Sequence, residues 1–359
     1  MSINKLLDLD SLNDQEIVQI ANYRYKHLGD LMKMRSDDPH YLHMRANVIG
    51  EMYEYVIYEK LLKWAIKSED VTEFILKGPY VEHVHKHKEG FQYDAKHQIY
   101  YNSGGETIAE FDSIFKKGNT IVFVEISTTE TKKLINNLKA GIKRKFKLLS
   151  YLFPEDEIRC LIITSSSQNI NLNDLKNTDL TRTKRYKLEP DTLINNKDSR
   201  SVVVPEHAKL KLIYALENNS FHYYPLLDKI HRNVEITTKT KTIEKIKIVV
   251  KPYTGLIERF FIGKLSASSF IKYIHDNGYE FPKNIRVKNA YLAYKIDEDL
   301  SITDRIYLST EKQRYYEIQN LKQMDIKKVT SRKRAPRDIK YLDEYLEYIS
   351  IEKWNQFVG

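Results

Sequence analysis

Two carboxylates stand inside apolar runs near the middle of the chain. Asp112 lies in EFDSIF and Glu125 lies in VFVEIST, and a Gly118-Asn119 turn separates the two runs. Burying an unpaired carboxylate costs roughly several kcal/mol, so acids in core-like strands need partners. One divalent cation can serve both acids, because Mg²⁺ is usually held by one or two protein carboxylates and keeps several of its waters. The pattern predicts a metal site on a β-hairpin.

The elements around this hairpin have to position the two acids. A helical apolar stripe from about Tyr41 to Lys67 precedes it, and a second one from about Glu130 to Leu152 follows it. The apolar run IRCLIITSSS then predicts a buried strand. We therefore expect the order helix, strand, strand, strand, helix, strand. Near-continuous apolar runs indicate central strands that are covered on both faces.

This order of elements, together with three acids, resembles the PD-(D/E)XK nuclease superfamily over about residues 41–167. The resemblance implies an α/β fold with a mixed sheet flanked by helices, and hydrolysis of phosphodiester bonds in DNA or RNA with Mg²⁺ or Mn²⁺. Glu51 in IGEMYEY matches the acid of the first core helix, although Glu54 is an equally simple choice. Asp112 and Glu125 match the strand acids. The carbonyl of Ile126 is implied as a further metal ligand.

The chain departs from the family pattern where the catalytic lysine is expected, because Ser127 occupies that position. Some branches of the superfamily take the lysine from the following helix, and EIST before a lysine-bearing helix is also similar to viral cap-snatching endonucleases. Lys139 and Lys143 are the candidates, with Lys132 and Lys133 behind them. A lysine at such a site can orient or deprotonate the attacking water.

The basic residues predict a polyanionic partner. The chain has 58 Lys+Arg against 49 Asp+Glu, a formal charge of +9. Lysine and arginine bind phosphates without reading sequence, although such clusters can equally be solvated faces. Five aromatic residues are candidates either for stacking bases or for the core: Tyr315, Tyr316, His222, Tyr223 and Tyr224. The predicted nucleic-acid-binding residues are Lys139, Lys143, Arg144, Lys145, Lys147, Arg332, Lys333 and Arg334, with Arg337 beside them.

Other features favour plain structural roles. His83, His85 and His87 alternate, which favours one solvated face of a strand over a metal cluster. The single cysteine, Cys160, is expected in the core and fits a reducing compartment. No run has the length of a membrane span, so we expect an intracellular, cytoplasmic protein, or one of the host cytoplasm or nucleus if it is viral.

The remaining sequence suggests three regions. Residues 1–167 are expected to form the nuclease-like domain, 168–198 a polar linker or surface excursion, and 199–359 a smaller α+β domain with a basic tail. Within the last region we expect a helix in EHAKLKLIYALENN, strand-like pieces in VEITTKTKTIEKIKIVVKPY and a helix in SASSFIKYIHDNG. This domain could bind nucleic acid, a partner protein or a second copy of the chain. Two other functions stay open: an inactive nuclease-fold protein that binds nucleic acid, and a basic structural or assembly protein.

Overall fold

The structure is a computed structural model that divides into two units, Met1–His222 and Tyr223–Gly359, and each is described by itself. It is a mixed α/β protein, as predicted. The described residues are 12–80, 90–93, 98–103, 106–128, 132–165, 171–183, 189–206, 210, 221–331 and 333–358. In this described part of the chain, no helix is long and apolar enough to cross a membrane.

A five-stranded mixed sheet forms the centre of the first unit, in the order β1-β5-β6-β7-β8. The pairs β1/β5 and β5/β6 are antiparallel, and β6/β7 and β7/β8 are parallel. Phe123 and Val124, neighbours on β6, are both fully buried, which confirms a strand covered on both faces. The strands are β1 (Val71–Phe74), β5 (Ser113–Lys117), β6 (Thr120–Ser127), β7 (Glu157–Thr164) and β8 (Thr178–Arg182).

The helices α4 (Tyr41–Lys67) and α5 (Lys132–Leu152) cover opposite sides of this sheet. Both follow the predicted apolar stripes. On α4 the stripe includes the buried residues Val48, Met52 and Val56. Cys160 is fully buried on β7, in agreement with its expected core role.

The hairpin differs from the prediction at Asp112. The run EFDSIF is not one strand, because the chain bends at Asp112 and passes from one sheet to another. The residues before the bend form β4 (Glu106–Phe111), which belongs to a separate antiparallel sheet with β2 (Gly90–Tyr93) and β3 (Ile99–Ser103). The residues after it form β5. Asp112 therefore joins two sheets and is not an interior position of one strand.

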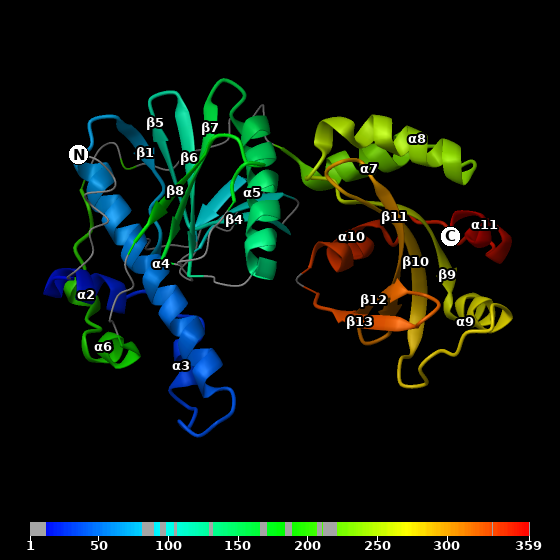
Figure 1. Cartoon of the computed structure of the whole chain (residues 1–359), viewed down its shortest axis with the longest axis horizontal. Helices are drawn as coiled ribbons and strands as arrows, with labels where there is room; N and C mark the ends of the chain where they lie inside the picture. Colours follow the sequence, from blue (N-terminus) through cyan, green and yellow to red (C-terminus); the bar gives the residue numbers. More distant parts are fainter. Residues whose placement is uncertain are drawn as a thin grey trace. The chain divides into compact units, whose positions relative to one another are not determined.

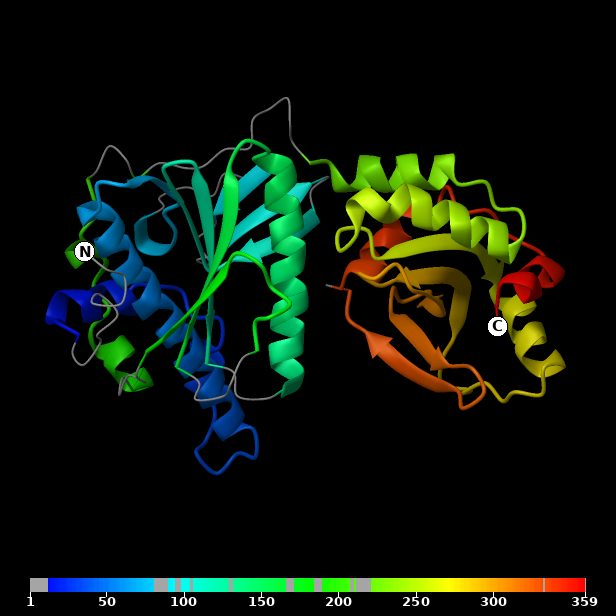
Figure 2. The same cartoon turned by 45° about the horizontal axis from the view of Figure 1, so that its top comes forward.

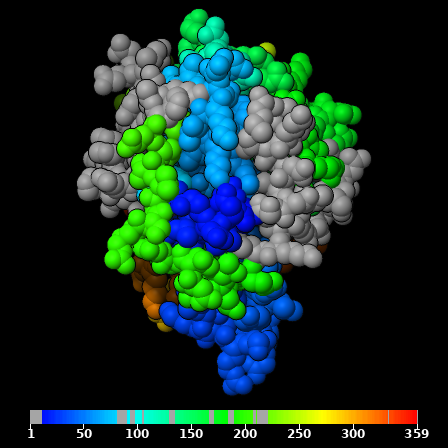
Figure 3. Space-filling view, turned by 90° about the vertical axis from the view of Figure 1, so that its left-hand side faces the viewer, coloured from blue at the N-terminus to red at the C-terminus, as the bar shows by residue number. Residues whose placement is uncertain are grey.

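The segment expected to be a linker, 168–198, carries structured elements instead. It contains β8, the parallel edge strand of the main sheet, and α6 (Pro190–Asn195). Figure 3 shows α2 (Asp14–Ala21), in dark blue, beside the green segment that follows β8. Just after this segment, Gln19 and the main chain of Val203 exchange two hydrogen bonds, at 2.8 and 3.2 Å, which anchor the following residues on α2. The short helix α3 (Leu28–Leu31) precedes α4.

The second unit is α+β, as predicted. Its five strands form an antiparallel sheet in the order β13-β12-β11-β10-β9, and Figure 2 shows α7 and α8 side by side against it. The strands are β9 (Arg259–Ser266), β10 (Val287–Ile296), β11 (Ile302–Thr310), β12 (Tyr315–Asn320) and β13 (Asp325–Val329). The helices are α7 (Tyr223–Asn233), α8 (Lys239–Val250), α9 (Ala267–Asp276), α10 (Arg334–Leu342) and α11 (Ile351–Phe357).

The strand-like pieces predicted before residue 252 were wrong, because α8 occupies that stretch. Thr242, Ile246 and Val250 recur every four residues and are all buried, so helical period outweighed the β-branched composition. The helix predicted in SASSFIKYIHDNG is confirmed as α9. The helix predicted in EHAKLKLIYALENN falls almost entirely outside the described residues.

Candidate active site

The two strand acids lie together at the end of β6. Ser113 on β5 pairs with Val124 on β6, so the next position in the antiparallel register places Asp112 opposite Glu125. Asp112 Oδ2 accepts a 2.6 Å hydrogen bond from the main-chain N–H of Ile126. The Glu125 side chain is only 9% exposed. The bend at Asp112 thus brings its carboxylate to the carboxyl end of β6, beside the second acid.

Lys145 of α5 completes this pair. Its Nζ forms an ion pair with Glu125 Oε1 and lies 5.3 Å from the ring centroid of Phe111. Burial, together with Asp112, raises the pKa of Glu125 to about 7 against the opposing effect of Lys145. Burial by itself would lower the pKa of Lys145, but Glu125 and Asp112 outweigh it and raise this pKa. We therefore expect Lys145 to be charged near pH 7, whereas Glu125 ionises less readily than an exposed glutamate.

The acid that α4 brings toward this centre is Glu54. Burial raises its pKa to about 7, Lys77 opposes the shift, and the negative charge of Asp112 adds to it. Lys77 Nζ lies 2.7 Å from Glu54 Oε1 and 4.9 Å from the ring centroid of Tyr58, and its side chain is fully buried. The charges of Asp112 and Glu54 both act on Glu125. Three carboxylates and two lysines thus form one electrostatic cluster, which we call the acid–lysine cluster: Glu54, Lys77, Asp112, Glu125 and Lys145.

Glu51, the acid expected from the helix, has other partners. Its Oε1 contacts His27 Nδ1, and its Oε2 accepts a 3.0 Å hydrogen bond from the N–H of Lys26. The carboxylate raises the pKa of Glu54 as a minor contributor, so it is near the cluster. Glu51 therefore holds the loop before α4, whereas Glu54 interacts with Asp112.

The lysines expected to be catalytic bind a different acid. Lys139 Nζ lies 2.8 Å from Asp174 Oδ1, and Lys143 Nζ lies 3.7 Å from Asp174 Oδ2. These ion pairs fasten α5 to the chain before β8. The side chains of Lys132 and Lys133 lie outside the described residues. The lysine that contacts an acid of the predicted site is Lys145, which the sequence had suggested only as a phosphate-binding residue.

The remaining predicted nucleic-acid-binding residues are divided between the two units and differ in exposure. Arg144 and Lys147 are half-buried on α5, Lys333 is exposed, and Arg332 lies outside the described residues. Arg334 faces inward: its guanidinium donates to Leu256 O at 2.9 Å and lies 4.8 Å from the ring centroid of Tyr223. Arg334 is therefore an internal cation of the second unit, and this position does not suit the phosphate-binding role expected from the sequence.

The aromatic candidates for base stacking differ in exposure, and two of the five are buried. Tyr223 and Tyr224 are buried, which favours the core alternative for both, while Tyr315 and Tyr316 are half-buried on β12 and His222 is exposed. The alternating His83, His85 and His87 lie outside the described residues.

No family model, curated protein or solved structure matches this chain.

The acid–lysine cluster fits a divalent cation in its donor chemistry. Carboxylate oxygens are the ligands that Mg²⁺ prefers, and one or two of them suffice when waters complete the shell. Ile126 N–H occupies one oxygen of Asp112, and Lys145 occupies one of Glu125, so each acid keeps a second oxygen without a partner among the described residues. Within the same described part of the chain, no group of three or more His, Cys, Asp or Glu is arranged to hold a metal. The residues that would hold an ion are thus the pair Asp112 and Glu125.

Lys77 is the residue of the cluster that sequence reasoning missed. It directly follows the apolar residues Phe74, Ile75 and Leu76 at the end of β1, and Gly78 after it has a φ of +75°. A lysine inside an apolar run is the same kind of signal as an acid inside one, because its charge needs a partner when buried. Applied to both signs of charge, the argument that found Glu125 would also have found Lys77.

Proposed function

We propose that the protein is a metal-dependent nuclease that hydrolyses phosphodiester bonds of DNA or RNA. The observation that carries the proposal is the placement of Asp112 opposite Glu125 with Lys145 on the second acid. The order α4, β1, β5, β6, α5, β7 supports a core of PD-(D/E)XK type. The formal charge of +9 is consistent with a polyanionic substrate.

In this proposal each member of the cluster has a separate task. Asp112 and Glu125 would hold Mg²⁺ or Mn²⁺, which would polarise the phosphate and lower the pKa of a bound water. Lys145 takes the place of Lys139 and Lys143 as the catalytic lysine, because its ammonium lies at the carboxylates, where the scissile phosphate would bind. Glu54 takes the place of Glu51 as the helix acid. Lys77 holds Glu54 in position and offsets its charge.

A cleavage assay tests this assignment. The purified chain is incubated with single- and double-stranded DNA and RNA in Mn²⁺ or Mg²⁺, next to the variants Asp112→Asn, Glu125→Gln and Lys145→Met. We expect each variant to lose most of the activity. The double variant Lys139→Met/Lys143→Met is the matched control, because both lysines lie on the same helix but pair with Asp174. Cleavage that survives Lys145→Met but not the control variant would return the catalytic role to Lys139 or Lys143.

The second candidate is a nucleic-acid-binding protein with an inactive nuclease fold. Ser127 at the expected lysine position favours it, as does the direct pairing of Lys145 with Glu125, which can stabilise the site without any metal. Salt-sensitive binding of nucleic acid without cleavage in any metal supports this candidate. Cleavage that depends on Asp112 excludes it.

A further inference from the structure

The second unit contains a cavity of about 520 Å³ between α7, β9 and the chain that follows α10. Cavities of this size, roughly 300–1,000 Å³, are typical of small-molecule sites. The chain beyond α10 is fixed there by β9: Lys264 N–H donates to Glu347 O, and Ile349 N–H donates to Lys264 O, both at 3.0 Å. The cavity wall is therefore built by main-chain pairing and is present without a ligand.

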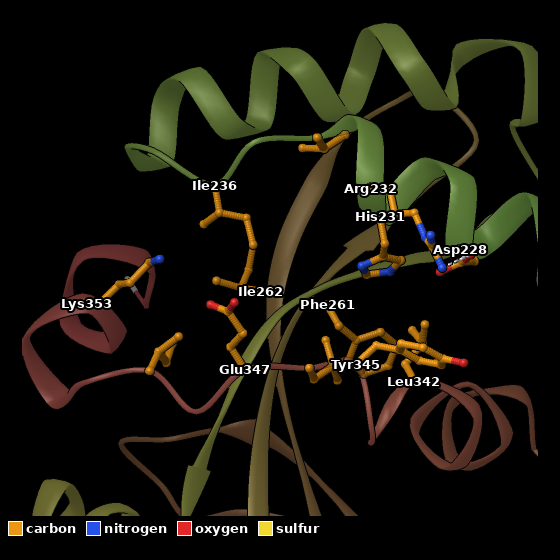
Figure 4. Close-up of a pocket in the computed structure, with 13 residues that line it drawn as sticks. Asp228, His231, Arg232, Ile236, Phe261, Ile262, Leu342, Tyr345, Glu347 and Lys353 are labelled. Atoms are coloured by element: carbon orange, nitrogen blue, oxygen red, sulfur yellow. Dashed lines mark ion pairs between the residues drawn. The ribbon is translucent and has the colours of Figure 1, made fainter.

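One residue that lines the cavity, His231, has a ring nitrogen without a partner among the described residues. His231 is stacked on Phe260, with ring centroids 4.3 Å apart and an interplanar angle of 7°, and its buried Nε2 has no hydrogen-bond partner among the described residues. Burial lowers the pKa of His231 to about 4, so the ring is neutral at pH 7. Figure 4 shows His231 and the carboxylate of Glu347 directed into the cavity from opposite walls. Because Nε2 is closed to water, a ligand can reach it only when the ring turns toward the cavity, and the hydrogen bond would then relieve the cost of a buried unpaired group.

The mouth of the cavity carries exposed aromatic rings. Tyr345 lines the cavity and is 61% exposed, and Tyr341 beside it is 37% exposed. Their ring centroids are 6.4 Å apart, and Tyr341 lies against the buried Tyr224 at 4.4 Å. The row Tyr224, Tyr341, Tyr345 thus runs from the core to solvent and ends in a ring that is open for stacking.

Cations complete the lining. Arg232 pairs with Asp228 at 2.9 Å, but its side chain is 70% exposed, so donors remain directed to solvent. Tyr341 and Tyr345 both lie near this guanidinium. Lys353 lies at the other end of the cavity. A flat ring, polar groups inside and a cation at the mouth match three parts of one ligand class: a base, its polar edge and its phosphate.

We propose that this cavity binds a nucleoside monophosphate unit, either free or within single-stranded nucleic acid. The base stacks on Tyr345, its edge hydrogen-bonds to His231 and Glu347, and its phosphate pairs with Arg232. Base–aromatic stacking of this kind tolerates any base, since every base has a π-face. An apolar ligand would leave His231 Nε2 unpaired, whereas the carboxylate of Glu347 is exposed and stays hydrated. The proposal goes beyond phosphodiester hydrolysis and does not depend on it.

Calorimetric titration with AMP, GMP, CMP and UMP, and with five-nucleotide single strands of DNA and RNA, tests the proposal. All titrations contain EDTA, so a failure of the hydrolase assignment cannot affect the result. We expect the monophosphates to bind. If the cavity accepts a nucleotide only as part of an oligonucleotide, we expect the single strands alone to bind. Tyr345→Ala should weaken this binding about tenfold or more, as for other base-stacking aromatics. Arg232→Gln should weaken it and make it less dependent on salt.

Tyr348→Ala is the matched control, because Tyr348 is 60% exposed on the same segment but does not line the cavity. Circular dichroism confirms that each variant is folded, and His231→Phe, which removes the polar group inside, should abolish binding. The proposal is overturned if no nucleotide or oligonucleotide binds at millimolar concentration. It is equally overturned if Tyr345→Ala binds as the native chain does, or if Tyr348→Ala weakens binding to the same extent.

Discussion

Replacing Lys77 by Met is the most direct test of the acid–lysine cluster. The lysine side chain is fully buried, and its ammonium lies 2.7 Å from Glu54 and 4.9 Å from the ring centroid of Tyr58. Met has a similar volume but no charge, so the substitution removes the counter-ion and leaves the packing nearly unchanged. Glu54 is then the uncompensated charge.

The size of the effect follows from the environment of Glu54. Removing one partner of a buried ion pair costs about 3–5 kcal/mol, and we expect about 3 kcal/mol because the Glu54 side chain keeps 26% exposure. Without Lys77 the pKa of Glu54 rises further above about 7, whereas it is 4.5 when unfolded. Between these values the folded state holds a proton that the unfolded state releases, so stability falls as pH rises. The penalty is therefore largest above pH 7 and smallest near pH 4.5.

Urea unfolding between pH 4.5 and 8 measures this penalty. Trp64 packs on Phe115 in the first unit, whereas Trp354 belongs to the second, so a Trp354→Phe background reports on the first unit. Lys67→Met, an exposed lysine at the end of α4, is the control and should change the free energy of unfolding little. Adding Glu54→Gln should restore most of the loss. A penalty that does not change with pH, or that Glu54→Gln does not relieve, would refute a charge-based role for Lys77.

Three further outcomes are expected. Lys145→Met should abolish cleavage but raise the affinity for Mn²⁺ measured by calorimetry, because the ammonium that competes with the metal at Glu125 is removed. Lys139→Met should change neither the cleavage nor the affinity for Mn²⁺. Gly263→Ala should destabilise the chain by about 1–3 kcal/mol in urea unfolding, since the new Cβ would lie 2.8 Å from Ile349 Cγ2; the further change Ile349→Ala should recover part of this loss. His231→Phe should make the free energy of unfolding less dependent on pH below 6.5. The buried ring has a pKa of about 4 against 6.5 when unfolded, so the native chain loses up to about 3 kcal/mol of stability as pH falls from 6.5 to 4, and the variant should not.

The sequence was sufficient for the elements whose apolar period is long. The expected helix from Tyr41 to Lys67 has the same bounds in the structure, and the strand in IRCLIIT is β7. The length of the periodic run was enough to place each element. On α4 the predicted stripe is buried together with neighbours such as Tyr55, Ile57 and Tyr58, so the helix is enclosed on more than one side. The conformation of short segments depended on contacts with residues outside them. At Asp112 a bend replaced a continuous strand, since the hydrogen bond of its carboxylate to Ile126 N–H is a tertiary contact that no local pattern contains.

The identity of the site residues shows the same division. Sequence reasoning found Asp112 and Glu125 because a carboxylate inside an apolar run needs a partner wherever the run folds. It named Glu51 as the helix acid and Glu54 only as an equally simple alternative, because the two are three residues apart and lie on neighbouring positions of one helical face. The loop before α4 decided this choice by supplying His27 to Glu51, while Lys77 supplied a partner to Glu54.

The choice of lysine depended entirely on tertiary structure. Lys139 and Lys145 flank the buried stripe of α5 from opposite sides, as the helical period requires. Both are therefore equally placed to reach a neighbour of that helix, and sequence gives no reason to prefer one. The packing of α5 on the sheet directs Lys145 to Glu125 and Lys139 to Asp174. The amino-acid sequence shows two acids inside apolar runs and a lysine-rich helix after them. Which lysine meets Glu125 depends on the rotation of that helix against the sheet, and this rotation is set by packing.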